Sequence, residues 1–96
     1  MNKYEVLYII KPVLEDEQYK TVVEKFSGII TANGGTIENV DVWGKRRLAY
    51  PIEYKTEGYY VLVNFEAAPE LPRELERNLR NDENVFNNFL IIRREA

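Results

Sequence analysis

The order of apolar and polar residues along the chain predicts six secondary-structure elements. Residues 3–10 alternate between two sets of side chains, as in a strand, and Pro12 ends the pattern because proline cannot donate to a strand ladder. Residues 15–33 carry an apolar stripe at three- and four-residue spacing, which predicts a helix. Gly34 and Gly35 are a strong stop signal for that helix, because glycine readily adopts the left-handed backbone that ends helices.

The rest of the chain predicts a hairpin, a second helix and a last strand. Residues 36–50 and 58–67 are expected to pair as strands around a loop at 51–57, which is too long for a tight two-residue turn. Residues 69–80 place leucines at four-residue spacing and predict a shorter helix. Residues 85–93 predict the last strand, but their pattern does not show which side chains face inward.

The order strand, helix, strand, strand, helix, strand is the split βαβ, or ferredoxin-like, pattern. It predicts a single α+β domain over residues 1–96, with an antiparallel sheet ordered four-one-three-two and both helices on one face. The opposite face stays uncovered, and its expected residues include Leu7, Ile9, Tyr60 and Leu62. Because exposed contiguous apolar area usually marks an interaction site, this face is a candidate docking surface for a partner.

Composition narrows the chemistry that such a domain could perform. The 96 residues are 45% hydrophobic and 30% charged, which is globular composition, and they include neither cysteine nor histidine. Disulfides, cysteine-based zinc sites and histidine-dependent catalysis are therefore excluded, and we expect no metal and no cofactor. An enzyme built from this composition would depend on carboxylates, lysine, arginine or tyrosine. No apolar run approaches the roughly 18 residues of a membrane span, and no signal peptide precedes the first strand. A cytoplasmic location is the expectation.

The net charge of −3 argues mildly against a free-standing nucleic-acid-binding protein, but the cations are concentrated. Lys45, Arg46 and Arg47, here called the basic run, are the only three consecutive cations, and Arg93-Arg94 is the only other pair. On a strand Arg46 and Arg47 point to opposite faces, so one of them must meet the helix side or its rim. Phosphate binding and protection of an exposed sheet edge against aggregation explain the run equally well.

Three other patterns have simpler structural explanations. Gly34 and Gly35 follow a helix rather than preceding one, so they suit a helix end better than a phosphate cradle. The acids at 15–17 suit the positive end of a helix dipole better than a cation site. Residues 57–62 resemble part of the RNP1 motif of RNA-recognition domains, but Glu57 stands where a basic residue is wanted.

The segment 43–52, Trp-Gly-Lys-Arg-Arg-Leu-Ala-Tyr-Pro-Ile, resembles the signature of the bacterial small ribosomal subunit protein six family. Other segments that resemble this family are Tyr4-Glu5, Asn33-Gly34-Gly35, Gly58-Tyr59-Tyr60 and Asn84-Val85, so the resemblance covers nearly the whole chain. It implies the ferredoxin-like fold and a non-enzymatic structural constituent of the ribosome. It also implies binding to the central domain of small-subunit ribosomal RNA, as a heterodimer with small-subunit protein eighteen.

The resemblance also selects candidate contact residues, without separating RNA contacts from partner contacts. Arg46, Arg47 and Tyr50 belong to the family's signature, and Lys45 lies in the same run. A second cationic cluster is expected where the first and last strands end, from Lys3, Arg93 and Arg94. A strongly basic partner would supply much of the phosphate neutralisation, which fits the acidic balance of this chain.

Two other function classes stay open for this fold. One is a small regulatory or ligand-binding module, since fold alone never fixes function. The other is a hydrolase like the acylphosphatases, which needs an arginine in the loop after the first strand. Here that loop offers Lys11 and Pro12, and proline removes an amide donor where a phosphate would need one.

Overall fold

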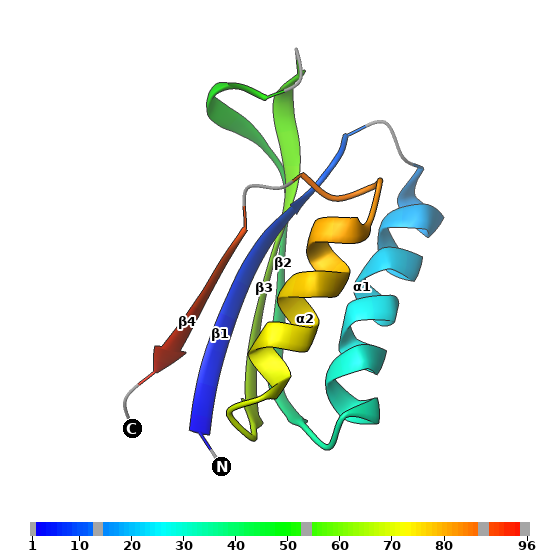
Figure 1. The fold of residues 1–96 in the computed structure, drawn as a ribbon. Helices are drawn as coiled ribbons and strands as arrows, with labels where there is room; N and C mark the ends of the chain where they lie inside the picture. Colours follow the sequence, from blue (N-terminus) through cyan, green and yellow to red (C-terminus); the bar gives the residue numbers. More distant parts are fainter. Residues whose placement is uncertain (1, 13–14, 53–54, 87–88, 95–96) are drawn as a thin grey trace.

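The computed structural model describes residues 2–12, 15–52, 55–86 and 89–94, with the backbone path alone for 49–52 and 55. Six elements follow one another in the predicted order (Figure 1). They are β1 (Asn2–Ile10), α1 (Asp16–Ala32), β2 (Thr36–Ile52), β3 (Lys55–Ala67), α2 (Leu71–Asn81) and β4 (Leu90–Arg94).

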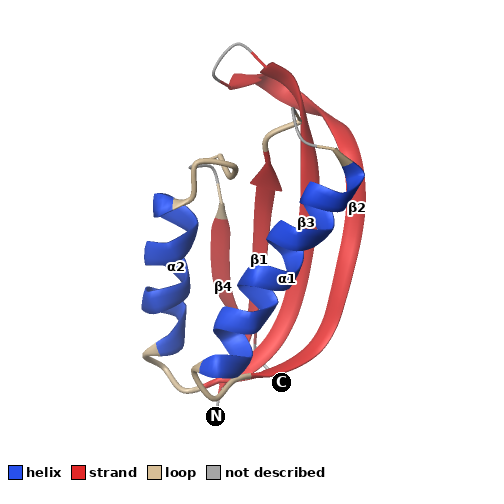
Figure 2. Cartoon of the chain, turned by 90° about the vertical axis from the view of Figure 1, so that its right-hand side faces the viewer, coloured by secondary structure: helices blue, strands red, loops and turns tan. Residues whose placement is uncertain are grey.

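The four strands form one antiparallel sheet in the order β2-β3-β1-β4. Both helices lie against the same face of this sheet (Figure 2). The other face, which we call the open face, is covered by neither α1 nor α2. This arrangement is the α+β, ferredoxin-like fold that the order of elements predicts.

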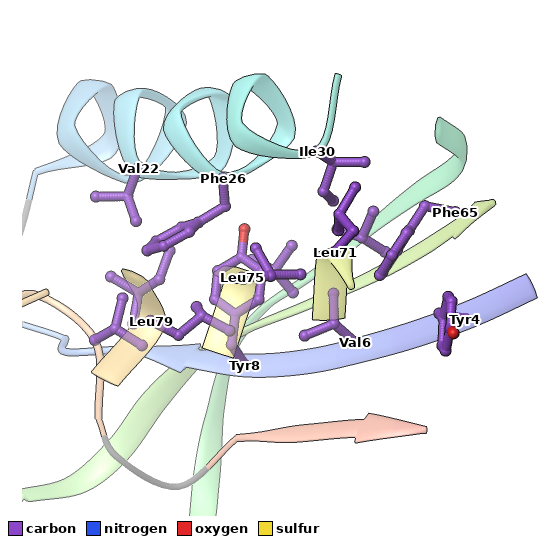
Figure 3. Close-up of a cluster of buried hydrophobic side chains, with 14 of the residues drawn as sticks. Tyr4, Val6, Tyr8, Val22, Phe26, Ile30, Phe65, Leu71, Leu75 and Leu79 are labelled. Atoms are coloured by element: carbon purple, nitrogen blue, oxygen red, sulfur yellow. The ribbon is translucent and has the colours of Figure 1, made fainter. Parts of the chain in front are cut away.

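The hydrophobic core lies between the helices and the sheet. The core side chains labelled in Figure 3 come from β1, α1, β3 and α2: Tyr4, Val6, Tyr8, Val22, Phe26, Ile30, Phe65, Leu71, Leu75 and Leu79. The ring of Tyr8 packs against that of Phe26, with centroids 5.3 Å apart. Each fully buried side chain of this size contributes about 1.5–3 kcal/mol, so the core fixes which face of every strand points inward.

Helix α1 begins and ends within one residue of the prediction. Gln18 accepts a hydrogen bond from the backbone N–H of Glu15 at 2.8 Å, as part of a capping box. At the other end Gly34 has a φ of 85°. A Cβ on Gly35 would lie 2.7 Å from Cγ2 of Ile30, so this close approach also requires glycine. Both glycines therefore serve the helix end, as the sequence indicates.

The hairpin differs from the prediction, because the loop expected at 51–57 is wrong. Strand β2 continues to Ile52 and β3 already begins at Lys55, and these two residues face each other in the ladder. The resulting arm of β2 and β3 projects beyond the helices (Figure 1). Pro51 is a misleading turn signal here, since β2 is an edge strand with one unpaired side, where proline is tolerated.

The last strand is also shorter than predicted. Val85 makes only an isolated bridge to Ile10, and β4 itself begins at Leu90. The register pairs Ile91 with the core residue Val6, so Ile91 faces the helices and Leu90 and Ile92 face the open side. This pairing shows which side chains of the last strand face inward, which the sequence pattern of 85–93 does not show.

Candidate functional site

A β-bulge in β2 decides which face each cation of the basic run occupies. Val42 and Gly44 pair with consecutive residues of β3, so Trp43 is an extra residue in β2. Gly44 has a φ of 80°, a conformation that glycine adopts without steric cost. The extra residue shifts the alternation, so Trp43 and Arg46 both lie on the open face. In a regular strand they would lie on opposite faces.

Arg46 lies against an aromatic cluster on the open face. The carbon Cζ of its guanidinium is 5.4 Å from the centroid of the Trp43 ring. Trp43 in turn stacks with Tyr60 of β3, with centroids 6.0 Å apart and planes 12° apart, and its Nε1 donates to Asp41 at 2.9 Å. We call Asp41, Trp43 and Tyr60 the Trp43 shelf, and Arg46 rests on it.

The other two cations of the basic run lie toward the helix-bearing side. The Nζ of Lys45 is 5.9 Å from the ring centroid of Tyr19 in α1. Arg47 faces Glu57 across the ladder, which places opposite charges on neighbouring strands. Across the described residues, no carboxylate lies within ion-pair distance of any member of the run. The run therefore straddles the sheet edge, with Arg46 on one face and Lys45 and Arg47 on the other.

Tyr50 is the one predicted contact residue whose surroundings are not described. Its backbone belongs to β2, but its side chain lies outside the described part of the structure. Its role as a contact residue stays a prediction.

The second predicted cluster forms only in part. Lys3 and Arg94 face each other across β1 and β4, and both contact the carboxylate of Glu38 in β2, at 3.9 and 2.5 Å. Arg93 lies on the opposite face and donates from Nη2 to Oδ1 of Asn2 at 3.2 Å. Including Arg93 in the cluster is therefore wrong. The negative charge of Glu38 also offsets one of the two positive charges of Lys3 and Arg94.

The open face carries an apolar groove of about 180 Å³. The residues that line it are Glu5, Leu7, Trp43, Leu62, Leu90 and Ile92. Leu90 and Ile92 are 56% and 43% exposed, and together with the other apolar residues of the groove they form a contiguous apolar patch. Leu7 and Leu62 are where the sequence places them, whereas the contributions of Leu90 and Ile92 required the register of β4.

Two other residues expected on the open face are covered there. Ile9 is only 8% exposed, because Leu48 of β2 and Phe86 pack over it and Tyr60 packs against this cluster. Gly58 permits the close approach, since a Cβ there would lie 2.3 Å from Cγ2 of Ile9. The prediction that Ile9 is exposed on the open face is therefore wrong. Tyr60 does lie on this face, but its ring packs against Trp43.

Neither a metal site nor a membrane span is found in the described ranges. Among those residues no three metal-ligating side chains gather. The two helices, within the same ranges, are not long and apolar enough to cross a bilayer. What the geometry offers is a contact surface, made of exposed cations at one sheet edge and an apolar groove beside them.

Comparison with known proteins shows the family to which the chain belongs. The family profile described as Ribosomal protein S6 matches residues 3–93. The chain belongs to the ribosomal protein S6 family. The resemblance seen in the sequence is thereby confirmed. As a member of the S6 family the chain is a ribosomal protein of the small subunit, associates with ribosomal RNA in the cytoplasmic ribosome, and is not an enzyme. The hydrolase alternative is therefore wrong.

Similar S6 proteins match over nearly their whole length. Small ribosomal subunit protein bS6 of Clostridium novyi (strain NT) is 52% identical over 95 residues, which cover 99% of either chain. The bS6 protein of Clostridium botulinum (strain Loch Maree) is 50% identical, over 95% of this chain and 97% of its own. The crystal structure of 30S ribosomal protein S6 from Thermotoga maritima matches with a TM-score of 0.91 at 30% identity, covering 97% of this chain and 87% of that one.

The part of the site that sequence reasoning missed is the Trp43 shelf. Its signal was present, since an isolated glycine such as Gly44 within a strand pattern suggests a bulge. Without the bulge the alternation cannot show that Trp43 and Arg46 share a face. The groove residue Ile92 was missed for a similar reason, because only the pairing of β4 with β1 shows its direction.

Proposed function

We propose that this chain binds the central domain of small-subunit ribosomal RNA as a heterodimer with small-subunit protein eighteen. The apolar groove carries the protein part of this proposal, because it exposes Leu90 and Ile92 beside Leu7 and Leu62. A contiguous apolar area of this kind is favoured in a soluble protein when a partner covers it. The S6 family membership and the fold are consistent with such an assembly.

The basic run supports the RNA part of the proposal. Its cations are exposed and, among the described residues, free of ion pairs, so their charge is available to phosphates. Arginine suits phosphate because its planar fork can donate two hydrogen bonds at once. The net charge of −3 means that a basic partner must supply most of the neutralisation. Further candidate contacts are Lys3, Tyr50, Arg93 and Arg94.

A filter-binding titration with a central-domain RNA fragment tests the proposal. It is carried out at two salt concentrations, with and without protein eighteen. We expect tight, salt-sensitive binding only with the partner present, because the net charge of this chain is −3. Equally tight binding by the chain alone would contradict the need for a heterodimer. No binding in either case would favour the regulatory-module alternative.

The groove has a matched control within the same sheet. Ile92 and Val42 are 43% and 46% exposed, but Val42 pairs with the core residue Val61 and so lies on the helix-bearing side. We expect Ile92→Ser to weaken the heterodimer about tenfold, from the loss of roughly 1–2 kcal/mol of apolar burial. Val42→Ser should leave the affinity for the partner unchanged. Equal losses in calorimetric titrations would show that the groove is not the docking surface.

A further inference from the structure

We propose that Trp43 is a positioning residue for Arg46, and that the bulge at Gly44 brings the two onto one face so that Arg46 presents an oriented guanidinium to RNA phosphate. The identity of the ligand rests on the proposed function. The positioning itself rests only on contacts within this chain.

The bulge is the first step of the argument. Arg46 lies three positions after Trp43, and a regular strand places residues an odd number of positions apart on opposite faces. Trp43 is the extra residue of the bulge, and the left-handed φ of Gly44 accommodates the shift. Bulges often re-aim a side chain at a functional site, and here the re-aimed side chain is Arg46.

The Trp43 shelf is the second step. The indole is held by the hydrogen bond to Asp41 and by stacking on Tyr60, so it is a fixed support. Arg46 lies over this ring, and a cation held there by the aromatic face keeps its N–H groups available as donors. Among the described residues, no acceptor takes a hydrogen bond from Arg46. Its donors are therefore oriented and available.

Comparison within the basic run is the third step. Lys45 carries a flexible ammonium group near Tyr19, and Arg47 faces Glu57 across the ladder. Arg46 alone combines an aromatic support with a bidentate donor group and no facing carboxylate in the described ladder. A side chain that is already ordered loses less conformational entropy on binding. Arg46 is thus the strongest phosphate contact of the three.

Measurements on the free protein test the positioning without any RNA. We expect the Nε–Hε group of Arg46 to show a higher heteronuclear NOE than that of Arg47, and Trp43→Leu to abolish the difference. Trp43 is the only tryptophan in the chain, so Arg46→Ala should also change its fluorescence. An Arg46 side chain as mobile as Arg47 in the unmodified protein would overturn the proposal.

RNA binding, measured with saturating protein eighteen, tests the role of the positioned group. We expect Arg46→Ala to weaken binding about tenfold and to lower the salt slope by about one unit, as loss of one charged phosphate contact should. Trp43→Leu removes no charge and should weaken binding about threefold. If Trp43 acts through Arg46, the double variant will bind no more weakly than Arg46→Ala alone. Additive losses would overturn the proposal.

The controls separate this inference from the proposed function. Arg47→Ala removes the same charge from the same run, and we expect a smaller loss than for Arg46→Ala. Because Trp43 also lines the groove, the affinity of Trp43→Leu for protein eighteen is measured separately, so that saturation is assured. If the unmodified heterodimer binds RNA but neither Arg46→Ala nor Trp43→Leu changes binding, the proposed function stands and the inference fails. If the unmodified heterodimer does not bind RNA, the proposed function fails, whatever the NOE shows.

Discussion

At the scale of single residues, Tyr8 is an unusual member of the core. Its ring packs against Phe26, but its hydroxyl is buried and finds no hydrogen-bond partner among the described residues. Burial raises the pKa of Tyr8 well above its usual value, and the charge of Tyr59 adds to the rise. A buried hydroxyl without a partner is a cost to the folded state, so this position is open to improvement.

We expect Tyr8→Phe to stabilise the protein by about 1 kcal/mol at neutral pH, because it removes the unsatisfied hydroxyl. The effect should grow in alkali. Above about pH 10 the unfolded chain can release the Tyr8 proton while the folded protein retains it, so stability falls as pH rises. Urea unfolding at pH 7 and at about pH 11 measures both effects. A destabilised variant would show that the hydroxyl has a partner.

Asp82 is a residue in which each carboxylate oxygen accepts a hydrogen bond. Its side chain is 5% exposed, and it accepts hydrogen bonds from Nζ of Lys25 at 2.6 Å and from the backbone N–H of Asn84 at 2.8 Å. This contact ties α1 to the turn that follows α2.

We expect Asp82→Ala to destabilise the protein by about 2 kcal/mol, because it leaves a donor in the turn without its acceptor. Glu76→Ala is the control, since Glu76 pairs with Arg80 on an exposed helix surface and should matter little. Thermal or urea unfolding compares the two variants. Similar losses would mean that Asp82 acts only as a surface charge.

At the scale of elements, the sequence of a single segment is enough to predict a helix. It is not enough to predict features that depend on pairing between distant strands. The apolar stripe and Gly34 predict α1 closely, because periodicity and helix caps are encoded within one segment. The bulge at Gly44 and the late start of β4 depend on which residue of another strand lies opposite. The family signature likewise marks Arg46 only as a candidate contact, and the strand pairing is needed to show that it lies over Trp43.

Two glycines with open space around them should respond oppositely to the same substitution. A Cβ would meet nothing within 4 Å at either Gly28 or Gly44. Gly44 has a φ of 80°, so Gly44→Ala should cost about 1–2 kcal/mol and loosen Arg46 from its shelf. Gly28 lies inside α1, so Gly28→Ala should stabilise by about 0.5–1 kcal/mol. Unfolding curves of the two variants test these signs, and a stabilising Gly44→Ala would contradict the bulge.

At the scale of the whole molecule, one layer of helices leaves the other face of the sheet free for contacts. Two cations on that face, Lys3 of β1 and Arg94 of β4, already contact a carboxylate of this chain. Glu38 of β2 reaches across the sheet to both of them. An edge strand on one side is thus tied to the edge strand on the other. Any RNA contact by these two cations competes with Glu38.

We expect Glu38→Gln to strengthen RNA binding by the heterodimer about two- to threefold at low salt, with a smaller gain at high salt. Filter binding at two salt concentrations measures this gain. An unchanged affinity would show that Lys3 and Arg94 contact no RNA.

The position of β1 in the sheet has a consequence for how the chain folds during its own synthesis. β1 precedes the other three strands in the chain, yet it lies in the interior of the sheet, between β3 and β4. Both of its neighbours are translated later, and the ladder from Lys3 to Arg94 closes only when β4 has been made. Until then a nascent chain holds an apolar strand with an unpaired edge. The growing polypeptide can therefore pair β2, β3 and β1 first, and its native sheet is complete only when β4 pairs with β1.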